Sequence, residues 1–312
     1  MGLRRRALIL AKEESTYGTD AVPTVAANSL LAFNPTLNPV GAKVTRNPVR
    51  DTISGSPGLM GSRYYELAFE TEFYGSGTAG TAARYGDLLE ACSMTETISG
   101  GVSVTYKPNS LGTGAKSVTL YANFDGRLHR LTGCIGTFEM ILQAGQPARI
   151  RWTFRGIYNA PTDTALAAPT LEANINAPPK VLGSAFTFNS IATLVVQQLS
   201  INLGNMMANR EDVNATHGYK GFAVTGRQAT ATINPETFAV GTYDLFTDWL
   251  NATLRQLSVV VGAAAGSIMT ITLPKCEVDD VRQGDRDGIE TWEIPLSLAY
   301  NTGDDEVQIV FT

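Results

Sequence analysis

The chain has 312 residues, a charged fraction of 17% and a formal net charge of −5 at pH 7. This length leaves room for two domains of ordinary size, and the acidic balance argues against a protein that grips nucleic acid through a basic patch. The low charge favours a surface that is largely covered, which indicates assembly. The widely spaced Cys92, Cys134 and Cys276 fit neither a disulfide framework nor a zinc site, and indicate synthesis in a reducing cytoplasm.

The first 30 residues are expected to form a mobile, extended arm. They begin like a secretory signal, but Ala7–Ala11 supplies only five consecutive apolar residues before Lys12, fewer than the roughly 7–15 that such a signal needs. No later stretch approaches the ~20 apolar residues of a membrane span. No membrane partner is therefore expected.

Residues 61–92 predict a strand, a glycine turn and a short helix. Apolar side chains alternate with glutamates in the first part, and this period of two is typical of a half-buried strand. Gly75–Gly80 ends the strand, and residues 81–92 predict the helix. The inward strand positions are Tyr65, Leu67, Phe69 and Phe73, and the outward ones are Glu66, Glu70 and Glu72.

Short alternating segments continue to residue 156. Asp125-Gly126 is a hairpin signal, and residues 148–156 form the last strand of this run, with Arg149, Arg151 and Arg155 outward. We expect these arginines to form cross-strand ion pairs with the outward glutamates. The alternative is that the glutamates line an anionic surface.

The strand–turn–helix unit recurs later in the chain. A second strand follows Arg227, and residues 241–254 predict a second helix with Tyr243, Leu245, Trp249 and Leu250 as its apolar positions. The alignment places Leu67 on Ala231, Phe69 on Ile233, Trp152 on Ile294 and Phe154 on Leu296. Because inward positions stay apolar while outward ones change, we interpret the repeat as a duplicated domain; chance similarity between β-rich segments is the alternative.

The predicted organisation has four parts. Residues 1–30 are an arm, residues 31–160 the first domain, and residues 183–312 the second. Between them, residues 161–182 are rich in Pro, Ala, Thr and Asn without a sustained period, which is typical of a linker.

Three motifs resemble functional sites. Gly75–Gly80 fits the G-x-G-x-x-G of dinucleotide-binding proteins, but the preceding strand alternates with glutamates, whereas a parallel Rossmann strand is continuously apolar. The acidic residues of 279–288 lack the ligand spacing of a calcium loop and predict a turn. His129 and His217 have no evident nucleophile or metal partner nearby. We therefore expect a protein that is not an enzyme and has no cofactor or metal.

Several segments together resemble the major tail tube proteins of long-tailed, siphovirus-like bacteriophages. The segments are the STYGTD-AVPT stretch (Ser15–Thr24), the loop VTRNPVRDTISG (Val44–Gly55), the Glu-bearing strand (Gly61–Glu72) and YGDLLEAC (Tyr85–Cys92). The likeness covers most of residues 7–160. The second half looks like a diverged copy that lacks the acidic strand face.

The resemblance implies a mainly β fold, with two tandem β-sandwich or barrel domains that each carry one short flanking helix. Such domains join edge to edge into rings, and stacked rings form a hollow virion tail tube through which DNA leaves the head without specific binding. With two domains per chain, three chains give six similar positions, so a trimeric ring with pseudo-sixfold symmetry is expected. A tape measure protein and tail-end proteins are further expected partners, and assembly is expected in the host cytoplasm.

The resemblance also implies contacts between adjacent rings through Val44–Ser62 and Asn205–Thr225. The candidate contact residues are Arg46, Arg50, Asp51, Ser54, Gly58, Leu59, Met60, Arg210, Glu211, Asp212, Tyr219 and Lys220. The sequence leaves open two other functions, a carbohydrate-binding pair of β-sandwiches and the tube of a bacterial injection system.

Overall fold

Strands make up most of the chain, which confirms the mainly β fold. The structure, a computed structural model, describes residues 3, 5–110, 116–171 and 178–312. Three short helices lie in these ranges, and none of the three has the length and apolar content to cross a membrane. In chain order the elements are β1 (Ala7–Glu13), α1 (Val25–Asn28), β2 (Ser29–Leu30), β3 (Ala32–Val44), β4 (Leu59–Glu72), α2 (Gly86–Ala91), β5 (Met94–Ser99), β6 (Ser103–Pro108), β7 (Val118–Phe124), β8 (Arg127–Gln143), β9 (Arg149–Tyr158), β10 (Thr162–Asp163), β11 (Ala185–Phe188), β12 (Val196–Asn202), β13 (Asn205–Glu211), β14 (Tyr219–Arg227), β15 (Thr230–Pro235), α3 (Leu245–Leu250), β16 (Arg255–Val261), β17 (Met269–Val278), β18 (Arg282–Arg286), β19 (Ile289–Leu298) and β20 (Gln308–Phe311).

The first half of the chain builds a sheet around β4. Its neighbours are β3 and β9, and β8, β7 and β1 follow beyond β9. Leu67 and Phe69 of β4 are buried, because the strand alternation turns them into the core against aromatic residues of β9. Asp125 and Gly126 form the two-residue turn between β7 and β8, both at positive φ (49° and 99°), as their hairpin signal predicted.

The second half repeats this strand order. β12, β15, β19, β17, β16 and β11 are successive neighbours and take the places of β3, β4, β9, β8, β7 and β1. The registers also agree, since Leu67 pairs with Phe154 and the residues aligned with them, Ala231 and Leu296, pair with each other. The repeat therefore extends from the sequence to the pairing of the backbone.

Irregularities in the ladders recur as well. The register shifts between Val118 and Leu120 where β7 meets β8, and between Arg255 and Leu257 where β16 meets β17. A bulge adds one residue to one strand and changes its twist. Shared bulges at matching places favour duplication over chance similarity, although the domain boundaries themselves stay a prediction.

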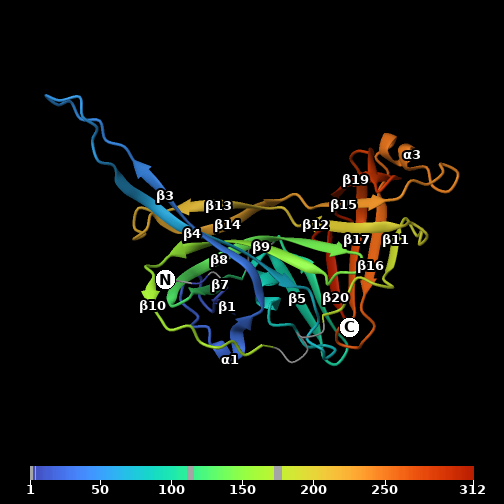
Figure 1. Ribbon diagram of the computed structural model, residues 1–312, viewed down its shortest axis with the longest axis horizontal. Helices are drawn as coiled ribbons and strands as arrows, with labels where there is room; N and C mark the ends of the chain where they lie inside the picture. Colours follow the sequence, from blue (N-terminus) through green and yellow to red (C-terminus); the bar gives the residue numbers. More distant parts are fainter. Residues whose placement is uncertain (1–2, 4, 111–115, 172–177) are drawn as a thin grey trace.

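β8 joins the two halves into one sheet. Its residues 127–134 pair with β7, whereas Glu139–Gln143 pairs with β12 of the second half. A second link is the pairing of β20 with β6, and one apolar core runs through both halves. Figure 1 shows the first half at the left and the second at the right. Across the described ranges the arrangement fits a β-sandwich and closes no barrel.

The N-terminal segment differs from the mobile arm that was expected. Residues 7–13 form β1, which pairs along its whole length with β7 and buries Leu8–Ala11. An apolar run that is too short for a signal region is long enough for a strand. Residues 1, 2 and 4 of the expected arm and residues 172–177 of the expected linker lie outside the described residues.

The second helix is shorter than the predicted 241–254 span. Tyr243 and Leu245 are buried as predicted, but Trp249 and Leu250 are 46% and 76% exposed. Asp248 is buried instead, because Arg255 holds its carboxylate through two hydrogen bonds of 2.6 and 2.7 Å. Over so few turns, the pairing of Asp248 with the partly exposed Arg255 outweighs the apolar periodicity of the sequence.

Candidate assembly surfaces

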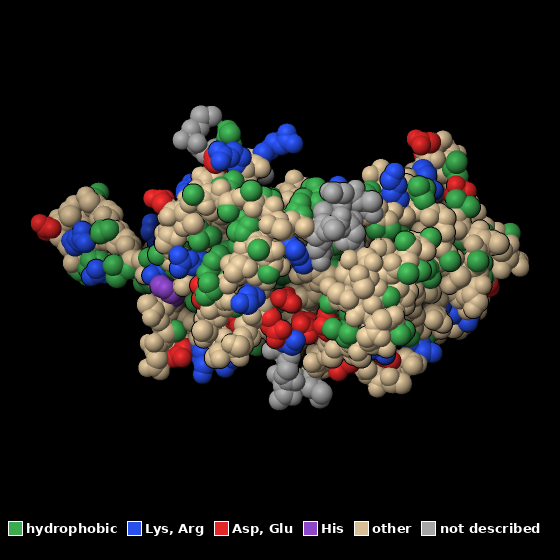
Figure 2. Space-filling view, turned by 90° about the horizontal axis from the view of Figure 1, so that it is seen from below, with side chains coloured by type: hydrophobic (Ala, Val, Ile, Leu, Met, Phe, Trp, Pro, Cys, Tyr) green, Lys and Arg blue, Asp and Glu red, His purple; other side chains and the backbone are tan. Residues whose placement is uncertain are grey.

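The hairpin of β3 and β4 projects from the body of the molecule as an arm, here defined as residues 41–62 (Figures 1 and 2). Val49 and Ile53 near its tip are fully exposed, and Leu59 and Met60 are more than half exposed. Exposed apolar side chains gathered on one projection are typical of an interaction site. The arm carries the predicted contact residues Arg46, Arg50, Asp51, Ser54, Gly58, Leu59 and Met60, all exposed except the half-buried Gly58.

The hairpin of β13 and β14 lies across the outer face of the first half (Figure 1). The ring of Tyr64 on β4 meets Tyr219 and Phe222 at centroid distances of 5.6 and 5.4 Å. The Nη1 of Arg155 donates to the carbonyl of Met207 at 3.1 Å. This hairpin is therefore an internal contact between the halves rather than a free loop.

The remaining predicted contact residues lie on this hairpin. Tyr219 and Asp212 are half-buried, whereas Arg210, Glu211 and Lys220 are exposed. The hairpin tip reaches the base of the arm, where the amide of Arg63, next to the arm, donates to the carbonyl of His217 at 3.0 Å. The two predicted groups thus meet at the arm's base, and Arg46 to Ser54 lie beyond this meeting point; their role in assembly stays a prediction.

Sequence reasoning missed the buried carboxylate of Glu14. It accepts hydrogen bonds of 2.7–2.8 Å from the amides of Gly18 and Gly133 and from the hydroxyls of Ser117 and Thr119. A buried carboxylate needs such a full set of donors. The signal available in the sequence was an acidic residue three positions after the apolar run 7–11.

Tyr17, in the stretch that Glu14 holds, connects three parts of the molecule. Its hydroxyl donates to the carbonyl of Gly133 at 3.1 Å and accepts from the amide of Phe222 at 2.7 Å. Burial raises the pKa of this phenol to about 12. The N-terminal segment is therefore a clamp between the first half and the β13–β14 hairpin.

A ladder of ion pairs covers the outer face of β4 and β9. Arg155 lies 3.0 Å from Glu66, and Arg149 and Arg151 lie 3.5 and 3.4 Å from Glu70. This confirms the predicted cross-strand pairing for Glu66 and Glu70, and Glu72 stands opposite Arg149 on the neighbouring strand. The partly exposed pairs leave this face close to charge balance but contribute little stability each.

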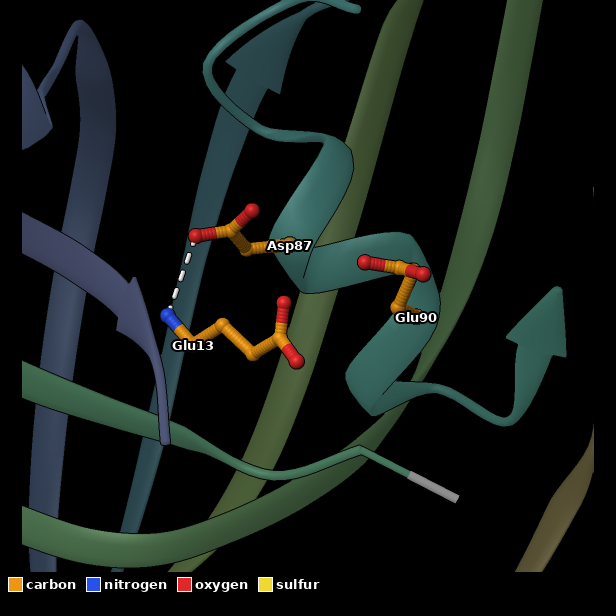
Figure 3. Close-up of side chains that lie close together, drawn as sticks. All are labelled: Glu13, Asp87 and Glu90. Atoms are coloured by element: carbon orange, nitrogen blue, oxygen red, sulfur yellow. Dashed lines mark hydrogen bonds between the residues drawn. The ribbon is translucent and has the colours of Figure 1, made fainter. Parts of the chain in front are cut away.

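Three carboxylates gather where β1 ends beside α2 (Figure 3). The ligand atoms of Glu13, Asp87 and Glu90 lie within 4.8 Å of one another, and burial raises the pKa of both Asp87 and Glu90. The Nζ of Lys116 lies 3.0 Å from Glu13 and 2.9 Å from Glu90. The one ammonium of Lys116 thus pairs with two of the three acidic side chains, and this geometry is that of an ion-pair cluster.

The glycine turn has a packing role. The amide of Gly77 donates to the carbonyl of Gly266 in the second half at 3.0 Å, and a side chain on Gly75 would place its Cβ 2.1 Å from the same carbonyl oxygen. Glycine is needed here because two backbones meet. The predicted acidic turn is the β18–β19 hairpin turn, Asp287-Gly288.

The three cysteines offer no reactive thiol. All are free and buried, and burial raises the pKa of each thiol, to about 12 for Cys276 and well above its ordinary value for Cys92 and Cys134. A nucleophilic cysteine needs an accessible thiolate.

Comparison with known proteins agrees with this β-rich architecture. A family model of phage tail tube proteins matches residues 4–310. No curated protein matches the sequence significantly. Because the match spans nearly the whole chain, the chain belongs to the phage tail tube protein family, whose members are structural components of the virion tail and assemble with their own copies into a tube.

Proposed function

We propose that three copies of this chain close into a ring with pseudo-sixfold symmetry, and that stacked rings conduct DNA out of the head of a long-tailed, siphovirus-like phage. The observation that carries this is the strand order that occurs twice in one chain. Two similar units per chain give six similar positions from three copies. A head-to-tail interface whose rotation closes yields a ring.

The repeat also supports a division into two domains, residues 31–160 and 183–312, around a linker of residues 161–182. β1 belongs with the first domain because it completes that sheet. Each domain keeps one flanking helix, α2 or α3, after its β4 or β15 strand.

The exposed residues of the arm, from Arg46 to Met60, contact other copies, and Arg210, Glu211 and Lys220 lie at the rim of the same assembly. The exposed Val49 and Ile53 support this, because isolated arms with apolar tips are costly in a soluble monomer.

DNA passes through the lumen without specific binding. The net charge of −5 supports this, and so does the pairing of the three arginines of β9 with glutamates, because each free cation that contacts phosphate adds salt-sensitive affinity. A tape measure protein and tail-end proteins complete the structure, assembly takes place in the host cytoplasm, and no catalytic step is involved.

Negative-stain microscopy combined with mass measurement tests the ring. We expect rings or tubes whose smallest closed unit has the mass of three 33.3 kDa chains. Rings of six chains would contradict the trimer, and a protein that stays monomeric at every concentration would contradict self-assembly itself.

Removal of residues 54–60 tests the arm. The variant should keep the far-UV circular dichroism of the parent but fail to polymerise. A matched variant with seven Gly and Ser residues in place of 54–60 separates the length of the arm from its side chains. Normal tubes from both variants would show that the arm tip is dispensable.

A further inference from the structure

The arm and the β13–β14 hairpin are equivalent parts of the two halves. Asn38 pairs with Glu66 at the base of the first, and Asn202 pairs with Thr230 at the base of the second. These residues correspond in the repeat, and the chain between each pair has the same length.

The two hairpins also share their register. After a bulge in each, Lys43 pairs with Met60 in the arm, and Met207 pairs with Val224 in the other hairpin. Equal length, register and bulge make Lys43 the counterpart of Met207. The hairpins differ in what they touch, since one is docked and the other is free.

The docked hairpin shows what such an arm can bind. Met207 belongs to an apolar cluster with Tyr64 and Ile135 of the first half. Near the tip, the ring of His217 packs edge-on against Tyr158 at a centroid distance of 5.3 Å. The hairpin of the second half therefore covers the end of the neighbouring sheet.

The second half offers the matching surface, on which Tyr300 is exposed and Glu277 is half-buried. Tyr300 follows β19 as Tyr158 ends β9, and it is 70% exposed. Glu277 pairs with Ser297 in the place where Ile135 pairs with Arg155. Among the described residues, Glu277 has no ion-pair partner.

The free arm complements that surface. Ile53, the counterpart of His217, is fully exposed and would meet the exposed ring of Tyr300. Lys43 is exposed and, within the described part of the chain, also has no ion-pair partner. Within the chain, the contact between Met207 and the Ile135 cluster is apolar. At the corresponding contact, Lys43 and Glu277 would meet as a pair of opposite charges.

We propose that the arm of one copy docks on the second half of another copy within the same ring, with Lys43 facing Glu277 and Ile53 covering Tyr300. The site on the second copy is the end of β15, β17 and β19. This docking rests on the proposed self-assembly and names its lateral interface.

The direction of the two hairpins supports docking within a ring. In Figure 1 both extend from their own half toward the same side of the molecule, and the first half is what the β13–β14 hairpin meets. In a ring, the second half of the neighbouring copy would lie beside the arm as the first half lies beside the β13–β14 hairpin. The arm then lies along the ring, and does not bridge to the adjacent ring as the sequence interpretation expected.

The edge of β3 explains why an arm is needed. The amide of Leu203 donates to the carbonyl of Phe138 at 3.0 Å, so odd-numbered residues of this segment face β8. Among the described residues no strand pairs with this edge of β3, and the counterpart of Leu203 on it is Pro39, which has no N–H to donate. A full ladder between copies is blocked, and the arm supplies the contact area instead.

Charge reversal tests the Lys43–Glu277 pair. Lys43→Glu and Glu277→Lys should each raise the protein concentration needed for assembly about fivefold per contact, since exposed pairs are worth a factor of this order. The double variant should return to within about twofold of the parent. Lys107→Glu, an exposed lysine on β6, is the matched control and should assemble normally. A double variant no better than either single one would overturn the pair.

Cysteine cross-linking tests the geometry. Gly218 lies close to Ser62, since a Cβ on Gly218 would be 2.7 Å from the Cβ of Ser62. In the proposed contact between copies, Ser54 takes the place of Gly218 and Gly226 takes the place of Ser62. Rings mixed from Ser54→Cys and Gly226→Cys chains should form disulfide-linked dimers on oxidation, because the native cysteines are buried. Val49→Cys mixed with Gly226→Cys is the matched control without cross-links.

The possible outcomes distinguish the docking of the arm from the proposed self-assembly into a tube. Rings or tubes that form without Ser54–Gly226 dimers overturn this docking and leave the proposed tube intact. Dimers that appear in tubes but not in isolated rings assign the arm to the adjacent ring and also overturn it. Absence of any assembly overturns both.

Discussion

The cores of the two halves share one arrangement of strands but fill it differently. In the first half Leu67 and Phe69 face Phe154 and Trp152, and in the second Ala231 and Ile233 face Leu296 and Ile294. Trp152 also contacts the rings of other aromatic residues. Backbone pairing is thus repeated in the two halves, whereas side-chain volume is not. Substitutions at corresponding positions should therefore change the free energy of unfolding by different amounts.

The largest difference is expected at Trp152 and its counterpart. Trp152→Ala should lower the free energy of unfolding by about 4–5 kcal/mol, because it leaves a large cavity and removes the 2.9 Å hydrogen bond from its Nε1 to the buried Thr71. Ile294→Ala should cost about 3 kcal/mol. Urea unfolding of unassembled protein measures both, and equal costs would mean that the two cores are equivalent.

The acids of the two helices should respond to pH with opposite signs. Burial alone would raise the pKa of Asp248, but hydrogen bonds from Arg255 and Tyr243 hold it below its ordinary value. Its stabilisation is therefore present above the unfolded-state pKa of about 3.9 and is lost as pH falls through the lowered folded-state pKa. Asp248→Asn should cost about 2–3 kcal/mol at pH 7, below the range for fully buried pairs because Arg255 is partly exposed.

Asp87 of α2 is the contrasting case. Burial raises its pKa although the amide of Glu13 donates to it. The folded state then binds a proton before the unfolded state does, so stability rises as pH falls through the raised pKa. Asp87→Asn should change stability at pH 7 by less than about 1 kcal/mol and remove that rise. Melting curves from pH 3 to 7 compare the variants, and parallel profiles would contradict the difference.

The ends of the two helices should differ by a smaller amount. The carboxylate of Asp244 caps α3 by accepting from the amide and hydroxyl of Thr247 at 3.0 and 2.6 Å, whereas no side chain caps α2. Asp244→Ala should cost about 1 kcal/mol. Hydrogen exchange should speed up in residues 245–250 and stay unchanged in α2; unchanged exchange in both would show that packing alone holds α3.

The smallest effect is expected on the outer face. Glu70→Gln should cost less than about 1 kcal/mol, since its arginine partners are about half exposed, and the cost should vanish at high salt. Asn234 holds the matching position in the second half, and Asn234→Gln should show no salt dependence. A salt-independent cost at Glu70 would mean that its packing matters more than its charge.

Local patterns predicted much of the fold. The alternation of β4, the Asp125-Gly126 turn and the Glu–Arg ladder depend on neighbours along a strand or across one ladder, and the structure confirms them. The length of α3 and the place of β1 did not follow from local patterns, because the first depends on the Asp248–Arg255 pair and the second on pairing with distant β7.

The candidate surfaces divide in the same way. The family resemblance pointed to Val44–Ser62 as a contact segment, and the structure shows that this segment projects from the body of the molecule (Figure 1). That the β13–β14 hairpin is docked could not be predicted, because Tyr219 and Phe222 meet Tyr64 across about half of the chain. The hydrogen bonds of Glu14 were equally hidden, since their donors come from separate segments.

The 17 residues of β8 carry hydrogen-bonded partners from both halves. This continuous strand therefore fixes the angle between the two halves within one chain. Any curvature that the proposed ring requires would already be present before copies meet, so little ordering would remain to oppose association.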